Sequence, residues 1–284
     1  MNQQRQANLF ILITKEKIKM MTLGMIEYWS EEGFKHLADL GLHAVEFCYN
    51  DGNNPDDLIA LIPDIKKWSE QYDVKVMSIG RWGADKIDDN GAIIEEELNN
   101  SYKLIDVCAE LGCPVFVTGV NEVEDKSFFD NCDYAVEFLS KVCAYAKEKG
   151  IKVACYNCDW ANFVREPKAW LAIMSRVRDL GIKYDPSHCI NSGSGKYLEE
   201  IKDWADRFYH FHIKGTININ GDHVDDPPAG LDMIDWRQIM GLLYEYKYDG
   251  MLSIEPHSGT WKGDLGEWGI KLTIDYMSKM IYNG

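Results

Sequence analysis

A repeating pattern of helix, glycine and short apolar run constrains the fold of this chain more than any other feature. Five times, a helix-like stretch ends at a glycine and an apolar run follows. The glycines are Gly41, Gly112, Gly150, Gly181 and Gly250. Glycine just past a helix end adopts the left-handed cap conformation at little cost. The runs are short and rich in β-branched or aromatic residues, which is typical of buried parallel strands.

The spacing of these glycines predicts eight such units. Successive gaps are 71, 38, 31 and 69 residues, and each long gap holds one more strand candidate, at 74–80 and 207–214. A first strand at 21–25 completes the set, and the clearest helices are expected at 55–72 and 95–111. Eight alternating units predict a parallel sheet closed into a single-domain (β/α)8 TIM barrel over residues 21–284. An open doubly wound sheet is the alternative, but the chain has no G-x-G-x-x-G or P-loop.

Composition narrows the range of partners. The formal net charge is −16, which disfavours nucleic acid, since a phosphate backbone needs clustered Lys and Arg. No apolar run approaches the ~18 residues of a membrane span. The run LFILIT (9–14) is too short for a signal peptide, and residues 1–20 are interpreted as an N-terminal extension. The eight cysteines are scattered, which favours reduced thiols and a cytoplasmic protein.

Charged and imidazole side chains fall at the C-terminal ends of the predicted strands, where TIM barrels place their active sites. They are Glu46, Asp185, His188, His210, His212, Lys214, Glu255 and His257. Period-two alternation puts the two histidines and the lysine of strand seven on one face. Such groups are costly to bury alone. A shared divalent metal would resolve the cost, and Asp, His and Glu suit Mn²⁺, Zn²⁺ or Co²⁺. The alternative is that these residues pair with each other or with the backbone.

Four motifs in the second half carry a family resemblance. They are YDPSH (184–188), HFHIKG (210–215), PPAGLDMIDW (227–236) and LSIEPH (252–257). In this order they resemble the xylose isomerase-like TIM barrels, a family of sugar (phosphate) isomerases and epimerases. The resemblance implies a divalent metal (Mn, Zn, Co or Mg) held by Asp185, His212 and Glu255. It also places His188 and Lys214 near the substrate.

Strand five departs from the family pattern. The family has an acidic ligand there, in a pattern like Ala-Leu-Glu-Asn, whereas this chain reads Ala154-Cys155-Tyr156-Asn157. Alternation leaves either Tyr156 or Asn157 facing inward, and the resemblance favours Tyr156. A neutral phenol is a poor ligand and a poor base at pH 7, so a two-glutamate epimerase mechanism is not supported and the metal is expected to bind weakly. The C-x-x-C of Cys155 and Cys158 has no second ligand pair for zinc, and its first cysteine lies in a strand, unlike a redox pair.

The favoured function is a metal-dependent enzyme that removes a proton next to the carbonyl of a sugar or keto-sugar, as an isomerase, an epimerase or a lyase/dehydratase. Glu255 or His257 would be the base, and Tyr156 would donate a hydrogen bond to the developing oxyanion. Trp82 and Glu46 are further candidates for substrate contact. The substrate is expected to be unphosphorylated, because the loop at 218–226 lacks Arg and Lys. The alternative is an inactive carbohydrate-binding barrel. Members of the family often form homo-oligomers, so a homo-oligomer is possible here. One branch of the family consists of DNA endonucleases, and the net negative charge of this chain disfavours that function.

Overall fold

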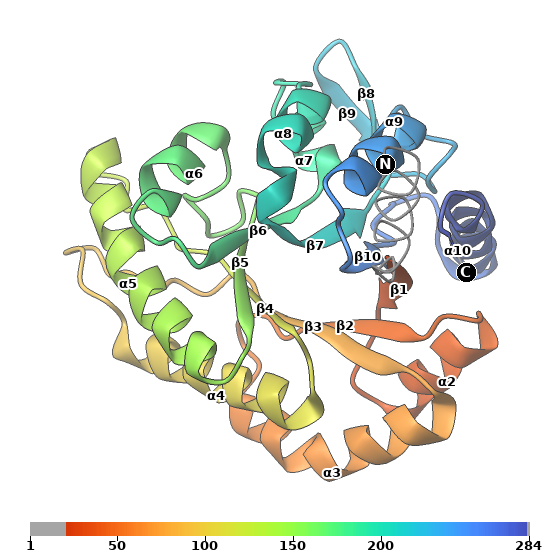
Figure 1. Cartoon of the computed structure of the whole chain (residues 1–284). Coiled ribbons are helices and arrows are strands. Elements are labelled where there is room, and N and C mark those ends of the chain that lie inside the picture. The colour runs from red at the N-terminus through yellow and green to blue at the C-terminus, as the bar shows by residue number, and fades with distance from the viewer. Residues whose placement is uncertain (1–20, 283–284) are drawn as a thin grey trace, which may run out of the picture.

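The computed structural model describes residues 21–282 and contains a closed barrel of eight parallel strands (Figure 1). The expected (β/α)8 barrel is confirmed. Around the barrel the order is β1, β10, β7, β6, β5, β4, β3, β2. The strands are β1 (Thr22–Ile26), β2 (Ala44–Cys48), β3 (Lys75–Arg81), β4 (Val115–Thr118), β5 (Lys152–Tyr156), β6 (Leu180–Tyr184), β7 (Phe208–Ile213) and β10 (Met251–Ile254). The predicted extension at 1–20 lies outside the described residues.

Helices surround the barrel (Figure 1). They are α2 (Glu31–Asp39), α3 (Pro55–Tyr72), α4 (Glu95–Leu111), α5 (Phe128–Glu148), α6 (Pro167–Met174), α7 (Pro186–Asn191), α8 (Tyr197–Trp204), α9 (Trp236–Glu245) and α10 (Gly263–Ser278). The predicted bounds of α3 and α4 are confirmed. No helix among the described residues combines the length and apolarity needed to cross a bilayer.

Three of the five glycines act as predicted and two do not. Gly41, Gly112 and Gly150 have φ between 68° and 73° and follow helices. Gly181 instead lies inside β6, where an added Cβ would come within 2.2 Å of the Tyr209 ring. Gly250 likewise has no positive φ, and the left-handed residue after α9 is Lys247. Gly181 is therefore required for packing inside the barrel rather than for capping.

A β-hairpin that was expected to be a loop follows β7. Its strands are β8 (Ile217–Ile219) and β9 (Asp222–Asp225), joined by Asn220 and Gly221. Both turn residues have positive φ, at 57° and 94°, as a two-residue primed turn requires. The Asn-Gly pair was the available sequence signal. The hairpin carries the chain to Asp226, which contributes to the site described below.

A buried ion-pair network ties together loops that follow β2 and β3. Arg81 donates from Nε and Nη2 to Glu97 at 3.0 and 2.6 Å, and from Nη1 to the carbonyls of Asn50 and Asn53. Lys86 Nζ lies 3.2 Å from the same carboxylate. Burial would raise the pKa of Glu97, but Arg81 and Lys86 outweigh it and lower the pKa to about 2.

Replacing Glu97 with glutamine is expected to lower the free energy of unfolding by about 2–4 kcal/mol at pH 7, because two buried cations lose their anion. The folded pKa is depressed, so this contribution is present above pH 4.5, the ordinary value, and is lost as the pH falls toward 2. Urea unfolding should therefore show a difference in the free energy of unfolding between wild type and Glu97→Gln that becomes smaller in acid. Glu110→Gln, which breaks an exposed pair with Lys66, should change stability by under ~1 kcal/mol. A difference in unfolding free energy that does not change with pH would contradict the depressed pKa of Glu97.

Candidate metal centre

The three predicted ligands meet at the C-terminal end of the barrel. Asp185 directly follows β6, His212 lies near the end of β7, and Glu255 directly follows β10. One ligand atom from each of the three lies within 4.8 Å of the others. His212 Nδ1 is 2.6 Å from Glu255 Oε2. The parallel register that aligns His212 with Ser253 brings these side chains together.

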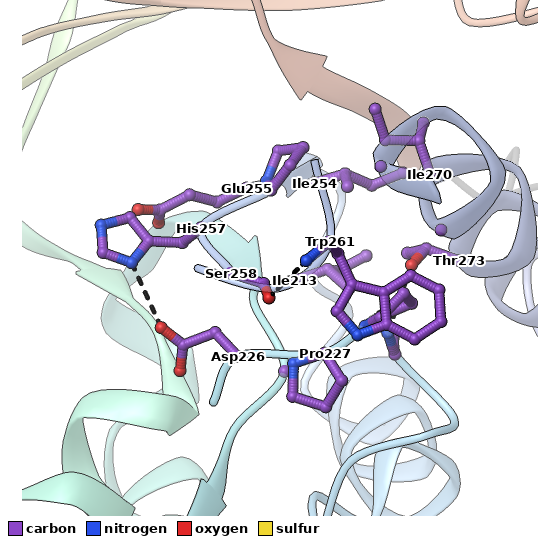
Figure 2. Close-up of a pocket in the computed structure, with 16 residues that line it drawn as sticks. Ile213, Asp226, Pro227, Ile254, Glu255, His257, Ser258, Trp261, Ile270 and Thr273 are labelled. Atoms are coloured by element: carbon purple, nitrogen blue, oxygen red, sulfur yellow. Dashed lines mark hydrogen bonds and ion pairs between the residues drawn. The ribbon is translucent and has the colours of Figure 1, made fainter. Parts of the chain in front are cut away.

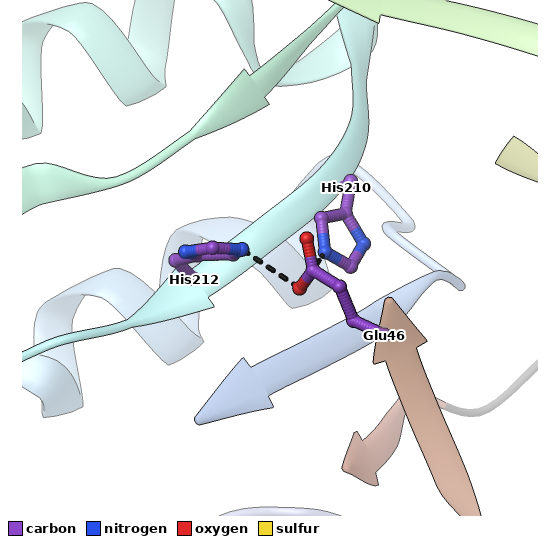
Figure 3. Close-up of side chains that lie close together, drawn as sticks. All are labelled: Glu46, His210 and His212. Atoms are coloured by element: carbon purple, nitrogen blue, oxygen red, sulfur yellow. Dashed lines mark hydrogen bonds and ion pairs between the residues drawn. The ribbon is translucent and has the colours of Figure 1, made fainter. Parts of the chain in front are cut away.

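Glu46 contacts this group through His212. Its Oε2 accepts from His210 Nε2 at 2.7 Å and from His212 Nε2 at 2.8 Å (Figure 3). Burial would raise the pKa of Glu46, but the two histidines hold it well below its ordinary value. Glu46 is fully buried, and the expected substrate contact stays a prediction. Its place is that of a carboxylate that orients a metal-binding histidine through the other ring nitrogen.

Asp185 uses its two oxygens differently. Oδ1 accepts from the backbone N–H and the hydroxyl of Ser187, at 2.9 and 2.7 Å, and so caps α7. Oδ2 is buried and has no hydrogen-bond partner. Asn157 holds the backbone of Asp185 from both sides, since its amide donates to the Asp185 carbonyl and accepts from the Asp185 N–H. A fixed, ionised carboxylate therefore directs one free oxygen into the barrel mouth.

Three nitrogens lie around this oxygen as ion-pair neighbours, but none of them forms a hydrogen bond with it. His188 Nε2 lies 3.4 Å away, Lys214 Nζ 3.5 Å and Lys183 Nζ 3.9 Å. Lys214 is also 3.8 Å from Glu255 Oε1 and 3.3 Å from His188 Nε2. Burial, with the two ammonium groups nearby, lowers the pKa of His188 to about 4 against the opposing effect of Asp185. His188 is thus neutral at pH 7 and able to accept or donate a hydrogen bond.

The donor set fits a divalent ion. Two carboxylate oxygens and an imidazole nitrogen suit Mn²⁺, Zn²⁺ or Co²⁺. Metal–ligand bonds of about 2.0–2.3 Å place the ligand atoms roughly 3–4 Å from one another. The ligand atoms of the three residues already lie within 4.8 Å of one another, so small side-chain shifts would bring them to these separations. The orphaned Asp185 Oδ2 and the Glu46 behind His212 both favour such an ion. A second group of Glu46, His210 and His212 is also compact, but Glu46 already satisfies one nitrogen of each histidine.

Strand five contributes an aromatic wall rather than a polar group. Tyr156 is the inward residue, packed with Trp82, Val117 and Ala154, so this alternative of the two is the one observed. Its ring stacks on Trp82 at 5.5 Å between centroids. Its hydroxyl donates to the Trp160 carbonyl at 2.8 Å, away from the acidic group. Only 1% of Tyr156 and 6% of Trp82 are exposed, and their expected contacts with the oxyanion and the substrate stay predictions.

His257 lies on the rim, held by a residue that the sequence did not single out. Its Nδ1 is 3.2 Å from Asp226 Oδ2 (Figure 2). The other oxygen of Asp226, Oδ1, lies 2.8 Å from His223 Nε2. The hydrogen bond with Asp226 raises the pKa of His257, and the side chain is 61% exposed. The pocket drawn in Figure 2, about 30 Å³, is too small for a sugar. A cavity of about 540 Å³ opens instead beside His188 and Asn157, over α6 to α8.

Sequence reasoning missed Lys183 and Asp226. Lys183 stands two residues before Asp185 on β6, so alternation could have placed it inward. Asp226 had no such signal, because its position depends on how the hairpin folds back.

Comparisons with solved structures show the same fold. A D-allulose 3-epimerase from Methylomonas sp., crystallised with D-allulose, is 17% identical, with a TM-score of 0.73, 92% of this chain covered and 98% of that one. A probable 3-DHS dehydratase from Bacillus anthracis is 13% identical, with a TM-score of 0.71 and coverage of 91% and 99%. The IOLI protein with a zinc atom is 16% identical, with a TM-score of 0.73 and coverage of 93% and 100%.

Comparison with curated proteins gave no match. The sequence model described as "Xylose isomerase-like TIM barrel" matches residues 34–277, which span all but the first of the barrel strands. The chain belongs to the xylose isomerase-like TIM barrel family.

Proposed function

We propose that this protein is a divalent-metal-dependent enzyme that removes a proton next to the carbonyl of a sugar or keto-sugar. The observation that carries the proposal is the buried Oδ2 of Asp185, which has no hydrogen-bond partner and lies beside His212 and Glu255. These three residues would hold the ion. When bound, the ion would polarise the substrate carbonyl and lower the cost of the negative charge that develops there.

Glu255 is the proposed base. Burial would raise its pKa, but Lys214 and the hydrogen bond from His212 hold the pKa well below its ordinary value. The carboxylate is therefore ionised at neutral pH, which is the form in which a general base acts. The raised pKa of His257 makes that residue a weaker candidate for the base and a better proton donor at the rim.

The residues around the cavity support a small polar substrate. His188 and Asn157 line the 540 Å³ space together with Asn191, Ser192 and Ser194. This volume lies within the range of small-molecule sites. Lys214 Nζ donates to Nε2 of the neutral His188 at 3.3 Å, so the two side chains present one polar edge to a substrate that reaches them. The solved relatives include a D-allulose 3-epimerase in complex with D-allulose and a probable 3-DHS dehydratase, which supports sugar-like substrates without selecting one.

The site is chemically one-sided. Ionisable groups come from β2, β6, β7 and β10, whereas β3 and β5 present the Trp82–Tyr156 pair. Burial raises the pKa of Tyr156 well above its ordinary value, so it is no base at pH 7. Proton transfer on two opposite faces is therefore not favoured. We propose isomerisation on one face, or elimination of a leaving group, ahead of two-carboxylate epimerisation.

Hydrogen–deuterium exchange tests the function without knowledge of the product. Protein loaded with Mn²⁺, Zn²⁺, Co²⁺ or Mg²⁺ is incubated in D₂O with a panel of ketoses and keto-glycosides, and NMR follows the proton next to the carbonyl. We expect metal-dependent exchange, with or without product, for at least one member. Tight sugar binding with no exchange under any metal would instead favour the inactive carbohydrate-binding barrel.

A further inference from the structure

Lys183 is an uncommon side chain for the interior of a barrel. It lies in β6 with 2% of its surface exposed. Among the described residues its ammonium group has no hydrogen-bond partner, and its one ion pair is the 3.9 Å approach to Asp185 Oδ2. Buried lysines need a partner that compensates for lost hydration. Lys183 thus faces the same free oxygen that the proposed metal ion would bind.

The ammonium of Lys183 lies near the centre of the polar group. Its charge influences His188, His210 and Glu255, which belong to α7, β7 and the segment after β10. Its Cα is in register with that of Tyr156 on β5, so it lies beside the strand that carries the aromatic wall. Lys214 occupies the other side of Asp185, toward Glu255 and His188.

The two ammonium groups together carry the charge of one divalent ion. They neutralise Asp185 and Glu255 when no ion is bound, and they repel an ion that enters. Of the two, Lys214 also contacts His188 and Glu255, whereas Lys183 approaches Asp185 alone.

We propose that Lys183 substitutes for part of the metal's charge in the unloaded protein and weakens metal binding. This inference rests on the metal site of the proposed function. It predicts that the wild-type barrel is stable without metal. Removal of Lys183 should raise the affinity for the ion and make the stability of the barrel depend on bound ion.

Titration with Mn²⁺ alone, by calorimetry, tests the inference. Lys183→Met should bind Mn²⁺ at least tenfold more tightly than wild type, whereas Lys183→Arg should stay weak. After chelator treatment, Lys183→Met should melt at a lower temperature than wild type, and Mn²⁺ should raise its melting temperature more. Lys152→Met is the matched control, because Lys152 lies on the adjacent β5, near its other end, over the Tyr209 ring.

Lys183→Gln provides a second, polar variant with the same expectation if the methionine variant does not fold. Equal Mn²⁺ affinity in wild type, Lys183→Gln and Lys183→Met would overturn this inference and leave the proposed metal site standing. Absence of Mn²⁺ binding in all of them would overturn both.

Discussion

Replacing Asp185 with asparagine is expected to abolish retention of divalent metal while the barrel stays folded. Asparagine keeps an oxygen that can accept from Ser187 and so preserves the cap of α7. It removes the charge on Oδ2, which is the buried oxygen without a hydrogen-bond partner. Loss of one of three charged or imidazole ligands should lower affinity by at least ~100-fold, a larger change than second-shell replacements give. Metal content after dialysis and the melting-temperature shift with Mn²⁺ measure the effect.

Asp235→Asn is the matched control for this variant. Asp235 also caps a helix, α9, through a side-chain oxygen that accepts from Gln238. The substitution is the same, but Asp235 belongs to neither candidate ligand group. Normal metal content is therefore expected. Full metal retention in Asp185→Asn would show that the ion, if bound, lies elsewhere.

The fold could be predicted because it follows from local periodicity, whereas the candidate ligand group was selected from the polar strand ends by the family resemblance of its motifs. The apolar runs recur at a nearly constant interval, and closure of eight units leaves little freedom in topology. Asp185, His212 and Glu255 end successive barrel strands, and parallel strands bring their C-terminal ends to the same rim. Their convergence therefore needed no knowledge of side-chain packing.

Roles that depend on contacts across the barrel could not be predicted in this way. Glu46 was expected to follow its strand, but it lies in the middle of β2, reaches His210, 164 residues away, and is fully buried. Tyr156 faces inward as the resemblance suggested, yet its hydroxyl turns to Trp160 because the ring stacks on Trp82 over Gly119. Lys183 was included in an apolar run, although alternation with Asp185 was the clue to its direction.

Replacing Glu255 with glutamine is expected to slow hydrogen–deuterium exchange by about 10²–10⁴-fold in the most reactive substrate, the range of a lost general base. Glutamine keeps an oxygen near His212 Nδ1 and preserves much of the shape. Metal content should therefore fall less than in Asp185→Asn, and exchange should fall more than metal loss explains. NMR exchange rates, normalised to bound metal, separate the two effects.

His257→Gln distinguishes the two candidate bases. His257 is largely exposed and bound to Asp226, with a raised pKa, so its loss should slow exchange by less than about tenfold. If His257 instead removes the proton, His257→Gln will lose exchange while Glu255→Gln retains it in proportion to its metal. That result would assign the base to His257 at the rim, where solvent competes for the proton, and not to Glu255 in the barrel interior. A closed reaction on one face of the substrate would then no longer follow from the buried carboxylate, and the hairpin that positions Asp226 would become part of the catalytic apparatus.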